Sequence, residues 1–192
     1  MNNIESINKL IDESSKAILE TKKISEKISK VVEIILKGLQ NDNKVIIFGN
    51  GGSAADSQHF AAELIGRYLI ERKSLAAISL TTDSSIITAL GNDYGFEYIF
   101  SRQCESIVKK NDIVIAISTS GQSKNVINAI LTSQKRGAVT IALTGNDGGE
   151  LQKIADVSLT VPSNSTPRIQ EAHRIIIHTI CELVEQSFKN SK

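Results

Sequence analysis

A run of hydroxyl side chains is the part of the sequence best suited to binding a ligand. The stretch Asp112 to Ser123 reads DIVIAISTSGQS, and a helical pattern begins near Asn125. Short O–H donors, the free N–H groups of a helix N-terminus and a glycine that admits a close ligand together suit a phosphate. The alternative is an ordinary loop whose serines only cap the helix.

A second loop of similar kind follows an earlier apolar run. The residues Gly49 to Ser53, read as GNGGS, come after the predicted strand 44–48 and precede a helix predicted over about 55–68. Its glycines let the backbone approach a ligand closely. Two such loops favour the phosphate interpretation, provided that the fold brings them together.

Few titratable side chains lie near these loops. His59 and Glu63 are four residues apart on one helix and therefore share a face, whereas Gln170 and His178 lie on the last predicted helix. A glutamate base with a histidine that moves protons between oxygens is the chemistry of an aldose–ketose isomerase. The same side chains could instead surround zinc, form a surface pair, or be structural, as we expect for His173.

The elements that must position these residues alternate along the chain. Five apolar runs, each followed by a helical pattern or a glycine-rich loop, predict a three-layer α/β/α sandwich with a five-stranded parallel sheet; the runs are 44–48, 76–80, 113–117, 139–143 and 157–161. In the flavodoxin-like order 2-1-3-4-5, both loops would face the switch point at which ligands bind. A dinucleotide site is less well supported, because GNGGSAAD lacks the spacing G-x-G-x-x-G.

The N-terminal segment carries apolar residues at helical spacing from Ile4 to Leu39. We predict a helical arm over residues 1–40 that serves oligomerisation, followed by one α/β domain over residues 41–192. The alternative is a helix that folds back on its own sheet. A stripe this long is more than one small domain needs, which favours a second subunit.

Composition narrows the class of partner. The 192 residues carry a net charge of +1 with dispersed cations, so neither a nucleic-acid groove nor a membrane-binding face is indicated. Cys104 and Cys181 belong to no CxxC pair, and we expect buried reduced thiols in a cytoplasmic protein. The predicted ligand is a small molecule.

Several motifs in order resemble the phosphoheptose isomerases of the sugar-isomerase (SIS) domain superfamily. They are GNGGSAAD at Gly49, GNDYGFE at Gly91, ISTSGQSKNV at Ile117, LTGNDGGEL at Leu143 and RIQEAH at Arg168. The resemblance covers about residues 31–188. It implies a cytoplasmic homotetramer with active sites between subunits, converting sedoheptulose 7-phosphate to D-glycero-D-manno-heptose 7-phosphate, the first step toward nucleotide-activated heptose for lipopolysaccharide or capsule.

The resemblance also implies a set of site residues. Glu63 would be the base and His178 the acid, and zinc would be bound by His59, Glu63, Gln170 and His178. The substrate-binding residues would be Asn50, Gly51, Gly52, Ser53, Asn92, Asp93, Ser118, Thr119, Ser120, Ser123 and Gln170.

Two points qualify the resemblance. Pro167 stands where some members carry an acidic residue, so that substrate contact is absent here. A non-catalytic factor of the same fold binds a replication initiator and lacks the catalytic pair, whereas this chain keeps Glu63 and His178.

Overall fold

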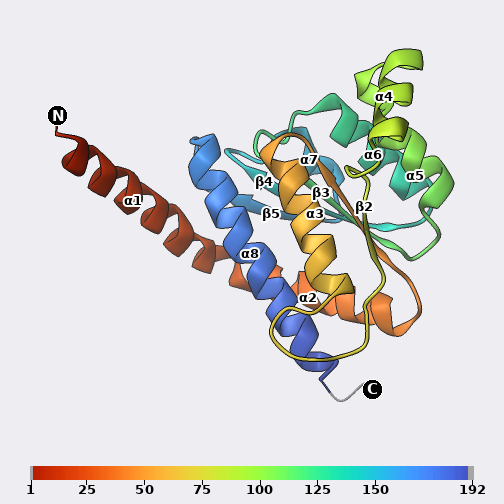
Figure 1. Cartoon of the computed structure of the whole chain (residues 1–192), viewed down its shortest axis with the longest axis horizontal. Helices are drawn as coiled ribbons and strands as arrows, with labels where there is room; N and C mark the ends of the chain where they lie inside the picture. The colour runs from red at the N-terminus through yellow and green to blue at the C-terminus, as the bar shows by residue number, and fades with distance from the viewer. Residues whose placement is uncertain (1, 190–192) are drawn as a thin grey trace.

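The computed structural model describes residues 2–189 and contains one parallel sheet of five strands (Figure 1). The strands are β1 (Val45–Gly49), β2 (Ala77–Ser79), β3 (Ile113–Ser118), β4 (Val139–Gly145) and β5 (Val157–Val161). Their order is β2-β1-β3-β4-β5, and every neighbouring pair is parallel. The predicted fold class and strand order are confirmed.

Alternation of side chains along each strand separates two apolar cores. In β1, Val45 and Ile47 point into one core while Ile46 and Phe48 point into the other. The first core packs against α2 (Ser25–Gln40), α3 (Gly52–Ile65) and α8 (Thr166–Ser187), and the second against α5 (Ser101–Ile107), α6 (Lys124–Lys135) and α7 (Gly149–Ile154). Strands buried on both faces explain the nearly continuous apolar runs in the sequence.

The predicted arm over residues 1–40 divides into two parts. α1 (Asn3–Glu20) projects from the body of the molecule, and a short 3-10 turn, η1 (Thr21–Ile24), connects it to α2 (Figure 1). Five large apolar side chains of α1 are more than half exposed: Ile4, Ile7, Leu10, Ile11 and Leu19. In contrast, Val31 and Ile35 of α2 are fully buried against the sheet. Of the two helices in the predicted arm, α1 extends beyond the sandwich and α2 belongs to it.

Two short helices are not apparent from the sequence. One is α4 (Ser84–Asp93), which the Asp83 side chain caps by accepting a hydrogen bond from the Ile86 N–H at 2.9 Å. The other is α7, which begins inside the motif LTGNDGGEL that starts at Leu143. Between α4 and β3 lie the 3-10 turn η2 (Phe96–Tyr98) and the helix α5. Such short elements offer too few turns for a clear helical period.

Both cysteines are buried and unpaired, as the sequence predicts. Burial raises the pKa of the Cys104 thiol to about 11 and raises that of Cys181 further, so neither is a reactive thiolate near neutral pH. Between residues 2 and 189, no helix combines the length and the apolar character that a membrane crossing requires.

Candidate functional site

A cavity of about 260 Å³ opens at the carboxyl ends of β1 and β3, where the two loops meet. Its lining consists of both loops and the start of α8: Asn50, Gly51, Gly52, Ser53, Ile117, Ser118, Thr119, Ser123, Thr166 and Gln170. The structure therefore brings together most of the predicted substrate-binding residues.

Hydrogen bonds within and between the loops shape this cavity. Asn50 and Asn125 exchange two side-chain hydrogen bonds of 2.9 Å each, which connect the first loop to α6. The hydroxyls of Ser118 and Ser123 lie 3.2 Å apart. Gly51 adopts a φ of +55°, in the left-handed region that favours glycine, and so lets the chain turn from β1 directly into α3.

The electrostatics of the cavity come from the backbone rather than from charged side chains. No residue of its lining is formally charged. Helices α3 and α6 both begin at the cavity, at Gly52 and Lys124, and their first N–H groups lack partners within the helix. Two helix N-termini with hydroxyl donors between them form a site suited to a phosphate dianion.

Three predicted substrate-binding residues lie outside this lining. The Ser120 hydroxyl accepts a hydrogen bond from the Gln122 N–H at 3.2 Å. Asn92 and Asp93 end α4, where the Asn92 amide donates to the Asp93 carboxylate at 2.8 Å. Their assignment to the substrate site stays a prediction.

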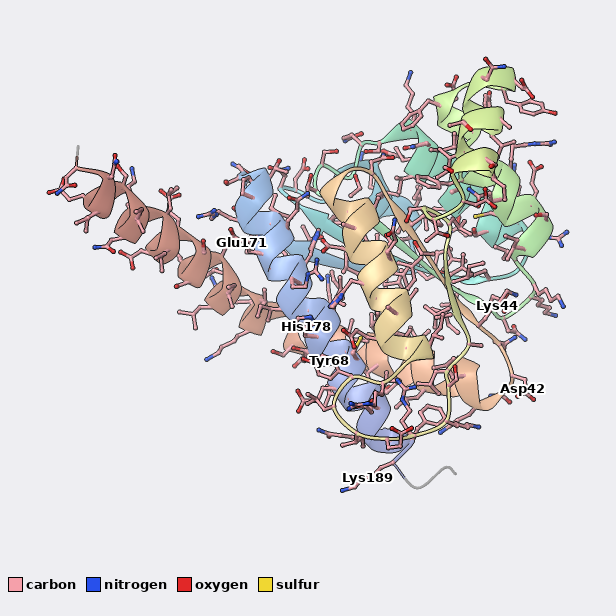
Figure 2. All side chains as sticks on the ribbon, in the orientation of Figure 1. Asp42, Lys44, Tyr68, Glu171, His178 and Lys189 are labelled. Carbon is pink, nitrogen blue, oxygen red and sulfur yellow. The ribbon has the colours of Figure 1, made fainter. Side chains whose placement is uncertain are left out.

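The predicted catalytic residues meet where α3 packs on α8. His59 Nε2 lies 2.9 Å from His178 Nε2 and 3.5 Å from Glu63 Oε1. The ring of Tyr68, which lies beside His178 in Figure 2, has its centroid 5.5 Å from the His178 ring. His59 and Glu63, which helical spacing places on one face of α3, thus lie beside His178, which is far away in the sequence.

An ion pair lies between this cluster and the cavity. Arg174 Nη2 donates to Asp56 Oδ1 at 2.5 Å, and the Asp56 side chain is only 5% exposed. Burial raises the pKa of Asp56 even though Arg174 opposes the shift. Burial and the Arg174 charge together lower the pKa of His59. The sequence carries no direct signal for this pair, although Asp56 lies four residues after Gly52 and Arg174 four residues after Gln170.

A buried carboxylate on α8 fixes the loop that carries Tyr68. Glu185 accepts hydrogen bonds from the N–H groups of Tyr68, Leu69 and Ile70 at 2.6–2.9 Å, and Arg72 Nε lies 3.4 Å from it. These backbone hydrogen bonds help to lower the pKa of Glu185, against the effect of burial. The sequence offered no signal for this role, because the donors are backbone groups of an irregular loop.

The fourth predicted ligand side chain, Gln170, lies at the cavity rather than among the three-residue cluster, and contacts Gly52 closely. His59 Nε2 and His178 Nε2 face each other at 2.9 Å, so a metal ion bound by both would displace any proton between them. Two imidazoles with a nearby carboxylate are donors that zinc accepts. Within residues 2–189, however, no three His, Cys, Asp or Glu side chains form a ready metal-binding group.

The chain is similar to known proteins in sequence and in structure. The family model for the SIS domain matches residues 9–145. A phosphoheptose isomerase of Sulfurimonas denitrificans is 52% identical over 174 residues, covering 91% of this chain and 89% of that protein.

Solved structures of two phosphoheptose isomerases superpose on nearly the whole chain. The one from Neisseria gonorrhoeae has a TM-score of 0.92 and 43% identity, over 96% of this chain and 100% of that chain. The one from Francisella tularensis has a TM-score of 0.93 and 37% identity, over 97% of this chain and 100% of that chain. By its sequence and its fold, this chain belongs to the SIS domain family and, within it, to the phosphoheptose isomerases.

Proposed function

We propose that the protein interconverts sedoheptulose 7-phosphate and D-glycero-D-manno-heptose 7-phosphate. The observation that carries the proposal is the distribution of chemistry along α3 and α8, with an anion-binding cavity at their N-termini and the His59, Glu63 and His178 cluster further along. A sugar phosphate carries its groups in the same order, with the anion at one end and the reacting carbons at the other.

In this proposal the chain's own residues divide the work of the proton transfer. Glu63 takes the carbon-bound proton and returns it to the neighbouring carbon, while His178 exchanges protons with the two sugar oxygens. Tyr68, whose ring centroid lies 5.5 Å from that of His178, would cover one side of that ring. The presence of Glu63 and His178 at one site supports an enzyme over the non-catalytic factor of the same fold.

We further propose zinc, bound by His59, Glu63, Gln170 and His178, as the metal of this site. When bound, zinc would supply a positive charge that polarises the sugar oxygens. A glutamate that binds the metal is a weaker base, so Glu63 would have to exchange its bond to the metal before it takes the carbon-bound proton.

The proposal extends to the assembly and the setting. The exposed apolar face of α1 supports burial against other copies in a homotetramer with sites at subunit interfaces. Asn92 and Asp93, outside the cavity of their own chain, would then be free to reach a site in the assembly. We place the enzyme in the cytoplasm, at the first step toward heptose for surface polysaccharide.

An assay that detects the heptose 7-phosphate product tests the function directly. Purified protein should convert sedoheptulose 7-phosphate, and Glu63→Gln should abolish most of the turnover. Absence of product from a folded, zinc-supplemented wild-type protein would contradict the proposal.

A further inference from the structure

Helices α3 and α8 run in the same direction and meet in successive polar pairs. Gly52 lies against Gln170, Asp56 binds Arg174, and His59 faces His178. We call this row of contacts the polar seam. At a rise of about 1.5 Å per residue, Gly52 and His59 are separated by roughly 10 Å along α3.

That separation corresponds to the length of the proposed substrate, so this inference rests on the proposed function. Single bonds of about 1.5 Å in a zigzag place C1 of an extended heptose 7-phosphate roughly 10 Å from its phosphorus. If the phosphate lies in the cavity and the reacting carbons lie at Glu63 and His178, the middle of the sugar chain lies beside Asp56 and Arg174.

A second cavity opens at that level. It has a volume of about 470 Å³ and shares Gly52 and Gln170 with the phosphate cavity. Its other lining residues are Ile18, Ala55, Asp56, Glu171, Arg174 and Ile175. The two cavities are therefore neighbours along the seam, separated by the close contact of Gln170 with Gly52.

Arg174 has hydrogen-bonding capacity to spare at this cavity. A guanidinium carries five N–H donors, and within residues 2–189 its only hydrogen bond is the one to Asp56. The Arg174 side chain is 37% exposed, whereas Asp56 is buried. The buried carboxylate anchors the guanidinium at one nitrogen and leaves the other donors toward the cavity.

We propose that Arg174, held in place by Asp56, binds the hydroxyl groups of the sugar between its phosphate and its reacting carbons. Arg174 is then a specificity-determining residue, and Asp56 a positioning residue that acts through it. The pair favours a polyol chain long enough to span the seam, and contributes nothing to the binding of phosphate alone.

The test compares two ligands that differ only in the presence of the polyol. Arg174→Met keeps the apolar stem and removes the donors, so KM for sedoheptulose 7-phosphate should rise about tenfold. The inhibition constant of inorganic phosphate should stay within about twofold. Arg102→Met, which removes an exposed arginine paired with Glu105 on α5, is the matched control and should change neither constant.

A double-mutant cycle tests the role of Asp56. Asp56→Asn should raise KM in the wild-type background and have no further effect on KM in Arg174→Met. Arg174→Met alone leaves the buried Asp56 carboxylate unpaired and could unfold the protein for that reason. The double variant removes both charges of the pair, so KM can still be measured without the arginine donors. Additive effects would overturn the positioning role of Asp56.

Three results separate the possible failures. An equal rise in the constants for sugar phosphate and inorganic phosphate would overturn the inference, as would no change in either. If the wild-type protein does not turn over sedoheptulose 7-phosphate, the proposed function fails. Calorimetric binding of sedoheptulose 7-phosphate and inorganic phosphate then gives the same comparison, and an unchanged ratio in Arg174→Met would overturn the inference independently.

Discussion

His59 on α3 and His178 on α8 face each other with their Nε2 atoms 2.9 Å apart, although 119 residues separate them in the chain. Where no metal ion is bound to both rings, one of the two nitrogens must carry a proton, because two lone pairs at this distance repel each other. The contact joins the face of α3 that carries Glu63 to the end of a seam that begins at the phosphate cavity. In the proposed function, this contact links substrate binding to proton transfer.

The first prediction concerns the catalytic pair. Glu63→Gln should lower kcat by at least about 10²-fold with KM little changed, because the amide cannot accept the carbon-bound proton. His178→Gln should have a similar effect. Glu105→Gln, at an exposed surface pair, is the control and should leave kcat unchanged. Near-normal turnover by folded Glu63→Gln would remove Glu63 from the role of base.

If the two residues act as a unit, the Glu63→Gln and His178→Gln double variant should be little slower than either single variant. Steady-state kinetics with matched zinc content checks this. Multiplying effects would instead show two independent contributions.

The second prediction distinguishes the hydroxyls of the phosphate loop. Ser123 lines the cavity, so Ser123→Ala should raise KM about tenfold through loss of one charge-assisted hydrogen bond. Ser120, which is predicted to bind phosphate but lies outside the lining, provides the comparison. An effect of Ser120→Ala equal to that of Ser123→Ala would place the phosphate closer to the turn, and an unchanged KM in both variants would place it elsewhere.

The third prediction concerns the close contact between the phosphate loop and α8. A Cβ on Gly52 would lie 2.5 Å from Gln170 Nε2, at the end of a flexible side chain. Gly52→Ala should therefore displace Gln170 and impair substrate binding, while the free energy of unfolding changes by less than about 1 kcal/mol.

Gly49→Ala is the contrasting variant. Its Cβ would lie 2.7 Å from the Ile117 carbonyl oxygen and 2.9 Å from that of Ser53. Backbone atoms cannot relieve such a contact by changing rotamer. We expect a loss of about 1–3 kcal/mol of stability, measured by urea unfolding. A Gly52 variant destabilised as much as the Gly49 variant would contradict this assignment of the close contact to Gln170.

The fourth prediction is a pH dependence of stability. His173 is fully buried, its Nε2 lies 3.0 Å from the Thr144 carbonyl oxygen, and burial lowers its pKa from 6.5 to about 4. The unfolded chain therefore binds this proton more readily than the native one. The contribution of the neutral His173 to the free energy of unfolding is fully present above pH 6.5. It falls by about 3 kcal/mol in all as the pH decreases toward 4.

Urea unfolding of the wild type and His173→Gln at pH 7.5 and pH 5 measures this contribution. The wild type should lose about 2 kcal/mol more than the variant between the two pH values. Equal losses in both proteins would assign the pH dependence to other groups.

The fifth prediction concerns the projecting helix. Deleting residues 1–20 removes α1 but keeps the buried residues of α2, so the protein should remain folded and its mass by light scattering should decrease. Leu10→Glu in the full-length chain should have the same effect, because the charge would lie on the exposed apolar face of α1. A truncated protein with the wild-type assembly would remove α1 from the interface.

The sequence by itself determined the elements that depend on neighbours in the chain. The apolar run ending at Ile117 and the hydroxyls that follow it specify a buried strand and a loop, whatever the rest of the chain does. Alternation of such units restricts the fold to a parallel sheet with a switch point. The facing of the two loops follows from that topology, which is why the cavity was predictable.

Only the tertiary structure decided which side chains meet across helices. Helical spacing places Asp56 on the same face as His59, but it does not tell which residue of α8 lies opposite. The distance between α3 and α8 and their relative rotation depend on packing against the sheet. For that reason only the folded protein shows three features of the site. They are the pair of Asp56 and Arg174, the separation of Gln170 from the histidines, and the backbone hydrogen bonds that Glu185 accepts.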